Sequence, residues 1–184
     1  MSGTVLIILA VVALLVLWGI SMQNKLVQSD ELCNNALKQI NVQQVSRYDA
    51  LKALIKLTRE YASYESETLE KVIAQRRITS SANPTVAEVN ANEQALQEVS
   101  AKLIAVAEQY PDLKANQNYQ QTMADIKQYE ENVRLSRMTF NDTVTKFNNM
   151  VRMFPGSIVA SILGFAKREY LADEPAKKDY PEIL

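Results

Sequence analysis

The sequence predicts an all-α fold, in which an N-terminal transmembrane helix continues into a long antiparallel helical bundle or coiled coil. Two observations support this prediction. The first 24 residues contain no charged side chain, and an apolar run extends over residues 5–20. The rest of the chain is polar and poor in glycine, and it repeats apolar residues at the helical period of about 3.5 to 3.6 residues.

The apolar run is long enough to cross a bilayer, because roughly 20 helical residues span a hydrocarbon core of about 30 Å. A cleaved signal peptide is the alternative, since Gly19 and Ser21 have a spacing that a signal peptidase tolerates. The run is long for a signal peptide, and no Lys or Arg precedes it. We therefore expect residues 1–22 to be an uncleaved transmembrane anchor that partners the lipid bilayer.

The charges that flank the run predict its orientation. Lys25, Lys38 and Arg47 follow the run. Cytoplasmic flanks of membrane spans are enriched in Lys and Arg, so this asymmetry places the N-terminus outside and the helical region inside.

Composition excludes several functional classes. The formal net charge of −1 over 184 residues leaves no broad basic surface, so no nucleic-acid partner is expected. Histidine is absent and Cys33 is the one cysteine, which excludes His-based catalytic pairs, mixed Cys/His zinc sites and an internal disulfide. The four glycines form no phosphate-binding cluster. We expect no enzyme activity, no cofactor and no metal, and Cys33 to be a buried thiol on a helix.

One domain over residues 23–172 follows the anchor, and its first two helices are predicted from their boundaries. No Pro or Gly interrupts residues 23–78, which predicts a single long helix continuous with the span. Ser80, Ser81 and Asn83 offer capping oxygens, and Pro84 suits a first helical position, so a second helix is expected over 84–109. Pro111 is expected to end it.

A third helix is predicted over residues 116–154, with Asn116 as its cap. Its seam alternates steps of three and four residues, as coiled coils do. The seam consists of Tyr119, Met123, Ile126, Glu130, Val133, Arg137, Phe140, Val144, Phe147, Val151 and Phe154. Two members, Glu130 and Arg137, are charged and need partners, because an unpaired buried charge costs on the order of several kcal/mol. They are either specificity or protonatable sites, or residues that fix register or reach solvent at the bundle edge; we favour the second reading.

The C-terminal region contains one further helix, expected over residues 157–171. Its apolar side chains are Ile158, Val159, Ile162, Leu163 and Phe165. Three roles are open: docking on the bundle, lying on the inner membrane surface, or joining subunits. Residues 173–184 combine two prolines with mixed charge, which predicts a loose tail. Because the first and third helices are longer than the second, we expect another copy of the chain to cover part of their apolar stripe.

Three stretches carry recognisable motifs. They are AEQYPDLKANQNY at 107–119, FNDTVTKFN at 140–148, and Phe154-Pro155 followed by Gly164-Phe165. Together they resemble the LemA family of bacterial membrane proteins, whose signatures read AEAYPDLKANxxF and YNDxVxxYN. The matching positions are Tyr110, Pro111, Asp112, Leu113, Asn116, Phe140, Asn141, Phe147, Asn148, Phe154 and Pro155. Arg47 and Asp49 also match, but the proline and asparagine that relatives carry just beyond them are absent.

The resemblance implies a single-pass protein of the bacterial inner membrane, with its N-terminus outside and its bundle in the cytoplasm. It implies no catalytic residue. Three functions remain open. The first is a scaffold that self-associates at the inner membrane surface, and the second is an adaptor that tethers a cytoplasmic or membrane partner such as a protease. The third is a signalling bundle, which would need a polar cavity around Glu130 and Arg137.

Overall fold

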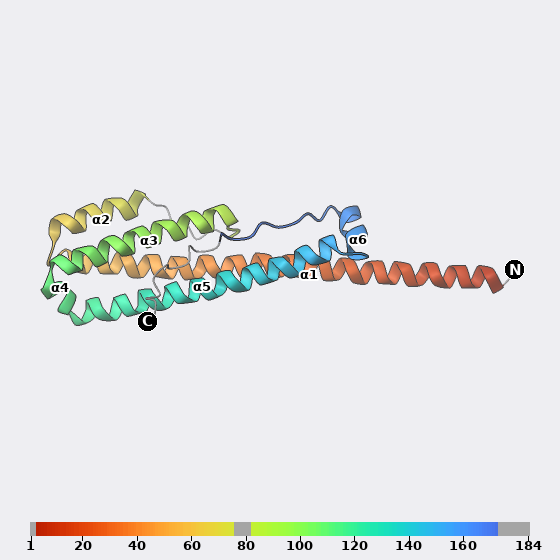
Figure 1. Cartoon of the computed structure of the whole chain (residues 1–184), viewed down its shortest axis with the longest axis horizontal. Helices are drawn as coiled ribbons and strands as arrows, with labels where there is room; N and C mark the ends of the chain where they lie inside the picture. Colours follow the sequence, from red (N-terminus) through yellow and green to blue (C-terminus); the bar gives the residue numbers. More distant parts are fainter. Residues whose placement is uncertain (1–2, 76–81, 173–184) are drawn as a thin grey trace, which may run out of the picture.

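A computed structural model describes residues 3–75 and 82–172, apart from the side chains of Val72 and Gln75. All regular structure in these residues is α-helical, as predicted. Figure 1 shows a rod whose N-terminal helix extends alone at one end and is joined by the other helices along the rest of its length. The expected tail at 173–184 and the capping residues Ser80 and Ser81 lie outside the described residues.

Helix α1 (Gly3–Thr58) has 56 residues, which corresponds to a length of about 84 Å. Its N-terminal part is apolar and long enough to cross a membrane, and 0% of its most apolar stretch is buried in the protein. This exposure distinguishes it from the core helix of a soluble domain. From Leu26 onward, α1 buries one face at steps of three and four residues, the pattern expected of an amphipathic helix.

The prediction of one unbroken helix over 23–78 is wrong. The chain turns after Thr58 and begins α2 (Ser63–Gln75), which folds back along α1. The turn needs no Pro or Gly, because the last carbonyl groups of α1 find partners beyond the helix: Ala62 N donates to Thr58 O at 2.8 Å, and Ser66 Oγ donates to Ile55 O at 3.0 Å. Ala62 and Leu69 continue the helical spacing of apolar residues past the turn, and both are buried in the hairpin. Periodicity alone therefore did not distinguish a hairpin from a straight helix.

Helix α3 (Val86–Gln109) begins at a capping box. Thr85 Oγ1 accepts from Glu88 N at 3.2 Å, and the Glu88 carboxylate accepts from Thr85 N at 2.8 Å. Pro84 therefore precedes the cap instead of occupying the first helical position, which corrects the expected start.

Helices α4 (Pro111–Ala115) and α5 (Gln117–Arg152) follow α3. Tyr110 is the last cap of α3, so Pro111 opens α4 instead of only ending a helix. Asn116 caps α5 as the sequence predicted, since its Oδ1 accepts from Tyr119 N at 3.1 Å. The expected seam is buried over most of α5, but its last member is misplaced: Phe154 lies beyond the helix and is 81% exposed.

The expected helix over 157–171 is also shorter than predicted. Helix α6 (Gly156–Leu163) stops at Gly164, whose φ of 75° is a left-handed conformation that favours glycine. Phe165 N then donates to Ala160 O at 2.9 Å. Residues 165–172, which we call the strap, are not helical and run back along the bundle (Figure 1).

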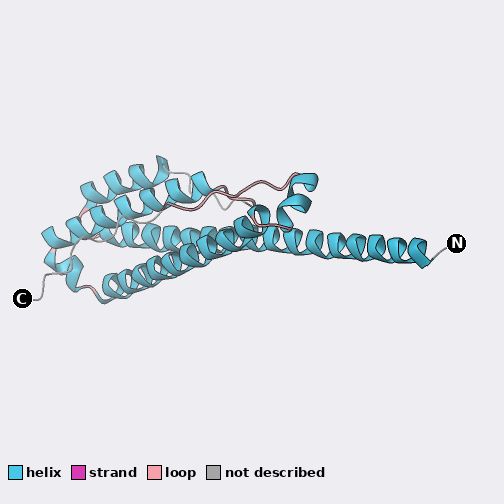
Figure 2. Cartoon of the chain, turned by 45° about the vertical axis from the view of Figure 1, so that its right-hand side comes forward, coloured by secondary structure: helices cyan, strands magenta, loops and turns pink. Residues whose placement is uncertain are grey.

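Different segments of the chain cover α1 and α5 at the two ends of the bundle. α1 and α3 run in one direction, while α2 and α5 run in the other. At the end far from the span, α2 and α3 cover α1 and α5; near the span, α6 and the strap take their place (Figure 2). Leu171 of the strap and Ala160 of α6 are 2% and 1% exposed. They pack with Leu26, Phe140 and Phe147 in an apolar cluster on the side of the span, which we call the near apolar cluster. The chain itself therefore covers much of the stripe that we expected a second copy to cover.

Candidate functional site

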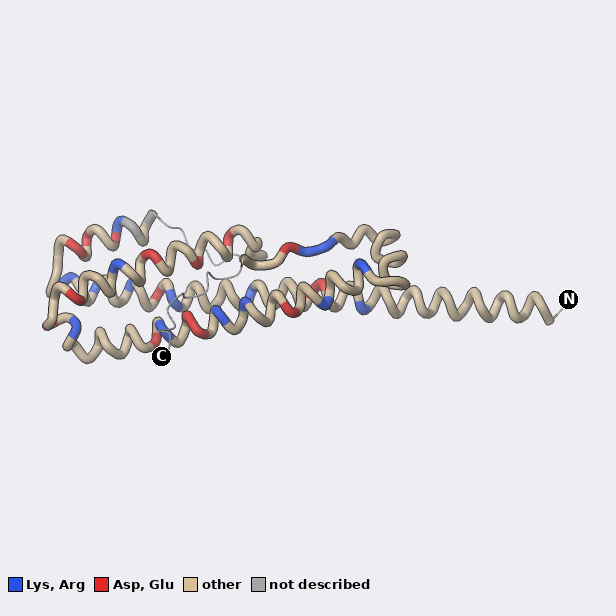
Figure 3. The backbone as a smooth tube through the Cα atoms, in the orientation of Figure 1, with Lys and Arg blue, Asp and Glu red and all other residues tan. Residues whose placement is uncertain are grey.

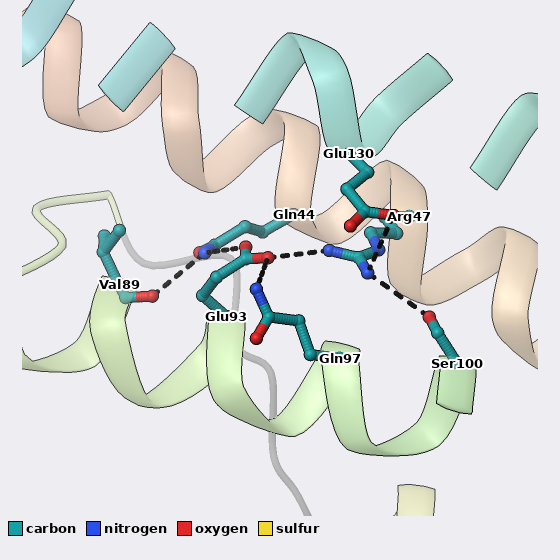
Figure 4. Close-up of polar contacts among 7 residues, drawn as sticks. All are labelled: Gln44, Arg47, Val89, Glu93, Gln97, Ser100 and Glu130. Atoms are coloured by element: carbon teal, nitrogen blue, oxygen red, sulfur yellow. Dashed lines mark hydrogen bonds and ion pairs between the residues drawn. The ribbon is translucent and has the colours of Figure 1, made fainter. Parts of the chain in front are cut away.

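The most unusual feature of the bundle is a buried polar network that joins three helices. Figure 4 shows Gln44 and Arg47 of α1, Glu93, Gln97 and Ser100 of α3, and Glu130 of α5. Arg47 is 1% exposed and Glu93 is 4% exposed. The network lies between two apolar clusters, one toward the span and one toward the far end.

Arg47 is the centre of this network. Its Nη1 donates to Glu93 Oε1 at 2.8 Å, and its Nη2 donates to Ser100 Oγ at 3.3 Å. The same Nη2 lies 3.7 Å from Glu130 Oε2. The guanidinium of α1 thus contacts both other helices at one level of the rod.

The second oxygen of Glu93 is also bound. Gln44 Nε2 donates to Glu93 Oε2 at 3.1 Å and to Val89 O at 2.9 Å, while Gln97 Nε2 donates to Glu93 Oε1 at 3.2 Å. Arg47 Nε and Gln44 Oε1 have no hydrogen-bond partner within the described part of the chain.

This arrangement fixes the register of the helices. A shift of α1 along α3 would separate the buried charges of Arg47 and Glu93, and each buried charge without a partner is costly. The two charges compensate each other inside the bundle. The network is therefore suited to specifying one alignment of the helices.

The two charged residues predicted in the α5 seam have separate partners. Glu130 contacts Arg47, and its side chain is 39% exposed, so it reaches the bundle edge. Arg137 is 7% exposed, and its Nη2 donates to Asn90 Oδ1 at 3.1 Å and to the carbonyl of Ala172. The structure thus places Glu130 in the network and Arg137 at the end of the strap.

Two asparagines of the FNDTVTKFN motif hold the strap on α5. Asn148 Oδ1 accepts from Arg168 N at 2.9 Å, and its Nδ2 donates to Arg168 O at 3.0 Å. Asn141 makes the same pair of bonds with the backbone of Leu171, at 3.0 and 3.3 Å. Each asparagine amide satisfies one donor and one acceptor of the strap backbone, as a neighbouring β-strand would.

The side chain of Arg168 clamps the strap onto α1. Its Nε donates to Asp30 Oδ1 at 2.7 Å, and this hydrogen bond raises the pKa of the guanidinium above its ordinary value. The guanidinium carbon lies 5.8 Å from the centre of the Phe147 ring, which also meets Phe165 edge to face at 6.2 Å. Phe140 and Phe147, both from the motif, are 1% exposed.

The AEQYPDLKANQNY motif forms the far tip of the rod. Leu113 is fully buried, and Asn116 Nδ2 donates to the Tyr61 hydroxyl at 2.9 Å. The Tyr110 hydroxyl donates to Glu65 Oε1 at 2.9 Å, and this bond to a carboxylate raises the pKa of Tyr110. The motif thus ties α4 and the start of α5 to the α1–α2 hairpin.

The remaining predicted residues lie on the surface. Asp49, Pro111, Asp112 and Pro155 are exposed and belong to no buried cluster of the described residues. In the predicted interaction segment, Val159 and Phe165 pack against the near apolar cluster, whereas three side chains are exposed: Ile158, Ile162 and Leu163.

Sequence reasoning missed the partners of Arg47. Glu93 and Ser100 lie seven residues apart on the stripe that contains Val89, Leu96 and Leu103 of α3. Glu93 is a charged residue within an apolar stripe. The same pattern identified Glu130 and Arg137 on α5, but Glu93 was not predicted from it.

The described residues offer little reactive chemistry. They contain no group of three His, Cys, Asp or Glu side chains that could hold a metal ion. Cys33 is buried, and burial raises the pKa of its thiol, which disfavours the reactive thiolate.

Comparison with known proteins identifies sequence relatives of this chain. Magnetosome protein MamQ 2 of Paramagnetospirillum magneticum is 29% identical over 75 residues, which are 41% of this chain and 28% of that protein. Magnetosome protein MamQ of Magnetospirillum gryphiswaldense matches over the same shares. Protein LemA of Metamycoplasma hominis is 26% identical over 141 residues, 77% of this chain and 64% of that protein.

The chain therefore matches less than a third of the length of the MamQ proteins and just under two thirds of Protein LemA. Residues 36–184 match the sequence model of the LemA family. Because this match covers most of the chain and an exposed apolar helix precedes it, this membrane-associated helical protein belongs to the LemA family.

Proposed function

We propose that the protein is a non-catalytic scaffold of the bacterial inner membrane that self-associates through its helical rod. The N-terminus lies outside and the bundle in the cytoplasm. The observation that carries this proposal is the continuity of α1, which runs as one helix from the apolar span through the length of the bundle. A rigid connection of this kind transmits the position of the span to the whole rod.

Internal pairing of the buried charges supports a structural role. Arg47 and Glu93 bind each other and nearby amide side chains, and these contacts join α1 to α3. Glu130 and Arg137 have different partners, so they do not form the shared polar site that a signalling bundle would need.

The basic residues near the span support the cytoplasmic orientation. Lys25 is exposed just after the span, and the fold brings two further exposed cations to this end of the rod, Arg152 at the end of α5 and Lys167 in the strap. Cations beside a span favour the cytoplasmic face.

Exposed apolar side chains on the outside of the rod support self-association. Val27, Leu32 and Val42 of α1 are 46%, 53% and 58% exposed, so the chain itself leaves these side chains in contact with solvent. A second rod packed along α1 would remove them from water.

The mass of the particle tests the proposal. The full chain is extracted in a mild detergent, transferred to nanodiscs, and weighed by native mass spectrometry. A discrete homo-oligomer is expected. A paired Leu32→Asp and Val42→Asp variant should dissociate, while Gln128→Asp, which adds a charge at an exposed polar position of α5, should not. A monomeric parent protein would refute self-association.

An adaptor is the second candidate, and a groove at the far tip favours it. The groove has a volume of about 390 Å³ between α3, α4 and α5. Its lining residues include Ile104, Ala107, Tyr119 and Met123, which suit an apolar segment of a partner. A foreign subunit in stoichiometric amount, lost in an Ile104→Glu variant but kept in Leu135→Glu, would favour the adaptor over the scaffold.

A further inference from the structure

Helix α6 has two faces of different character. Gly156 and Ala160, four residues apart, are buried against the bundle. Ile158 and Ile162, which lie on nearly the opposite face of the helix, are 52% and 78% exposed. The side chains just before the helix extend this apolar surface: Met153 is 64% exposed and Phe154 is 81% exposed.

The buried face of α6 meets α1 at the point where the span ends. The Cα of Gly156 lies so close to the Met22 side chain and to the Met150 carbonyl that an added Cβ would clash with both. Residues 3–22 form a helix of about 30 Å, the thickness of a hydrocarbon core. Contact with Met22 therefore sets α6 at the level where the span leaves the hydrocarbon.

The direction and charge of α6 match those of an interfacial helix. Both Figure 1 and Figure 2 show α6 lying across the long axis of the rod, so it is parallel to the plane of a membrane that the span crosses. Figure 3 shows no charged residue on α6, while Lys and Arg residues flank it on both sides. These are Arg152 before the helix and Lys167 after it, and Lys25 follows three residues after Met22, the residue of α1 that Gly156 contacts. Basic side chains beside an apolar face favour the surface of an anionic bilayer.

We propose that α6, together with Met153 and Phe154, is a second membrane-binding element that inserts its apolar face between the lipid headgroups and the acyl chains. The inference depends on the membrane span but not on self-association. Two attachments, one across the bilayer and one in its surface, would fix the tilt of the rod relative to the membrane. The bilayer is the occupant, because α6 lies beside Met22 at the end of the apolar span and basic residues flank its exposed apolar face.

Fluorescence quenching by brominated lipids tests this placement. Trp18 is the one tryptophan of the chain, so a Trp18→Phe background carrying Ile162→Trp has a single reporter on α6. The full-length protein is reconstituted in anionic vesicles whose acyl chains are brominated near the headgroup. We expect roughly twofold quenching of the reporter, because an interfacial helix places its apolar face at this depth.

The matched control is Leu135→Trp in the same background. Leu135 is 49% exposed on α5, away from the span, and a reporter there should not be quenched. Helical content and thermal unfolding of both variants should match those of the parent. Quenching of Trp18 in the unaltered protein reports insertion of the span, and its absence would overturn both attachments.

Two results would overturn the inference while the span is inserted. An unquenched reporter with red-shifted emission would show that the α6 face lies in water. An unquenched reporter with blue-shifted emission would show that a second copy covers it. Quenching in a protein that native mass spectrometry finds monomeric would support this membrane contact and refute the scaffold, so the two proposals fail separately.

Discussion

The two ends of the bundle use the same pair of helices but cover them in different ways. At the far end, α2 and α3 pack on α1 and α5 around apolar side chains such as Leu54, Leu103 and Ile126. Near the span, the same faces are covered by α6 and by the non-helical strap. The comparison shows that a non-helical segment in the place of a helix needs other groups to bind its backbone N–H and C=O.

The difference follows from backbone hydrogen bonds. A helix such as α3 satisfies its own donors and acceptors, so it needs only an apolar face to pack. The strap has no such internal bonds, and α5 supplies them through Asn141 and Asn148. These asparagines are seven residues apart, about 10.5 Å on a helix, while Leu171 and Arg168 are three residues apart, about 10 Å in an extended chain. Seven residues of α5 therefore span about the same distance as three residues of the strap, so both asparagines can bind the strap backbone at once.

The largest effect is expected at the boundary between the two ends. Replacing Arg47 by Ala leaves the buried carboxylate of Glu93 without its cation, which should lower the free energy of unfolding by about 3–5 kcal/mol. Denaturant unfolding followed by circular dichroism measures this loss. The matched control is Arg59→Ala, which breaks an exposed ion pair with Glu70 and should cost at most about 1 kcal/mol.

A paired variant sharpens this prediction. Replacing Arg47 by Met and Glu93 by Leu removes both charges, so stability should recover most of what the single variant lost. If the single Ala variant unfolds like the parent protein, the network does not hold the two ends in register.

A smaller, local effect is expected in the strap. Asn148→Ala leaves the N–H and C=O of Arg168 without partners, at a cost of about 1–2 kcal/mol. Hydrogen exchange should quicken at Arg168 and Leu171 while the far end is unaffected. Asn149→Ala, a change at the exposed neighbouring position, is the control. Equal exchange in the two variants would show that apolar packing alone holds the strap.

The start of α3, which packs against the near apolar cluster through Val86 and Val89, offers a comparable local test. Thr85→Ala removes the capping box with Glu88 and should cost about 1 kcal/mol. Faster exchange should be confined to the first turn of α3. Thr139→Ala, an exposed threonine within α5, should have no such effect, because no helix terminus depends on it. A loss of protection at the far tip, around Leu113, would show that the two ends are more strongly coupled than we infer.

The smallest effect concerns the chemistry of the near cluster. Burial raises the pKa of Cys33 in the folded state, so the protonated thiol favours folding below its ordinary pKa, and this contribution is lost as pH rises through the raised value. Alkylation of the folded protein at neutral pH should therefore be slow. A Leu32→Cys variant in a Cys33→Ser background places a thiol at an exposed position and should react quickly. Equal rates would show that the near cluster opens readily.

Sequence patterns predicted the elements whose signals are local. The apolar span, the seam of α5 from Tyr119 to Phe147 and the cap at Asn116 all follow from spacing or from a single side chain, and the structure contains each of them. The end of α1 was not predicted, because Ser66 reaches the Ile55 carbonyl only after the chain has folded back. The strap was read as helix for a similar reason, since its backbone partners lie on α5.

The sequence by itself determined an all-α chain, an apolar segment long enough to span a membrane, and the family that the motifs identify. It did so because hydrophobic periodicity, span length and motifs are properties of neighbouring residues. Only the tertiary structure decided that Arg47 pairs with Glu93, that the chain covers its own near stripe, and that α6 lies beside Met22. These depend on contacts between residues far apart in the chain, whose pairing is set by the packing of whole helices.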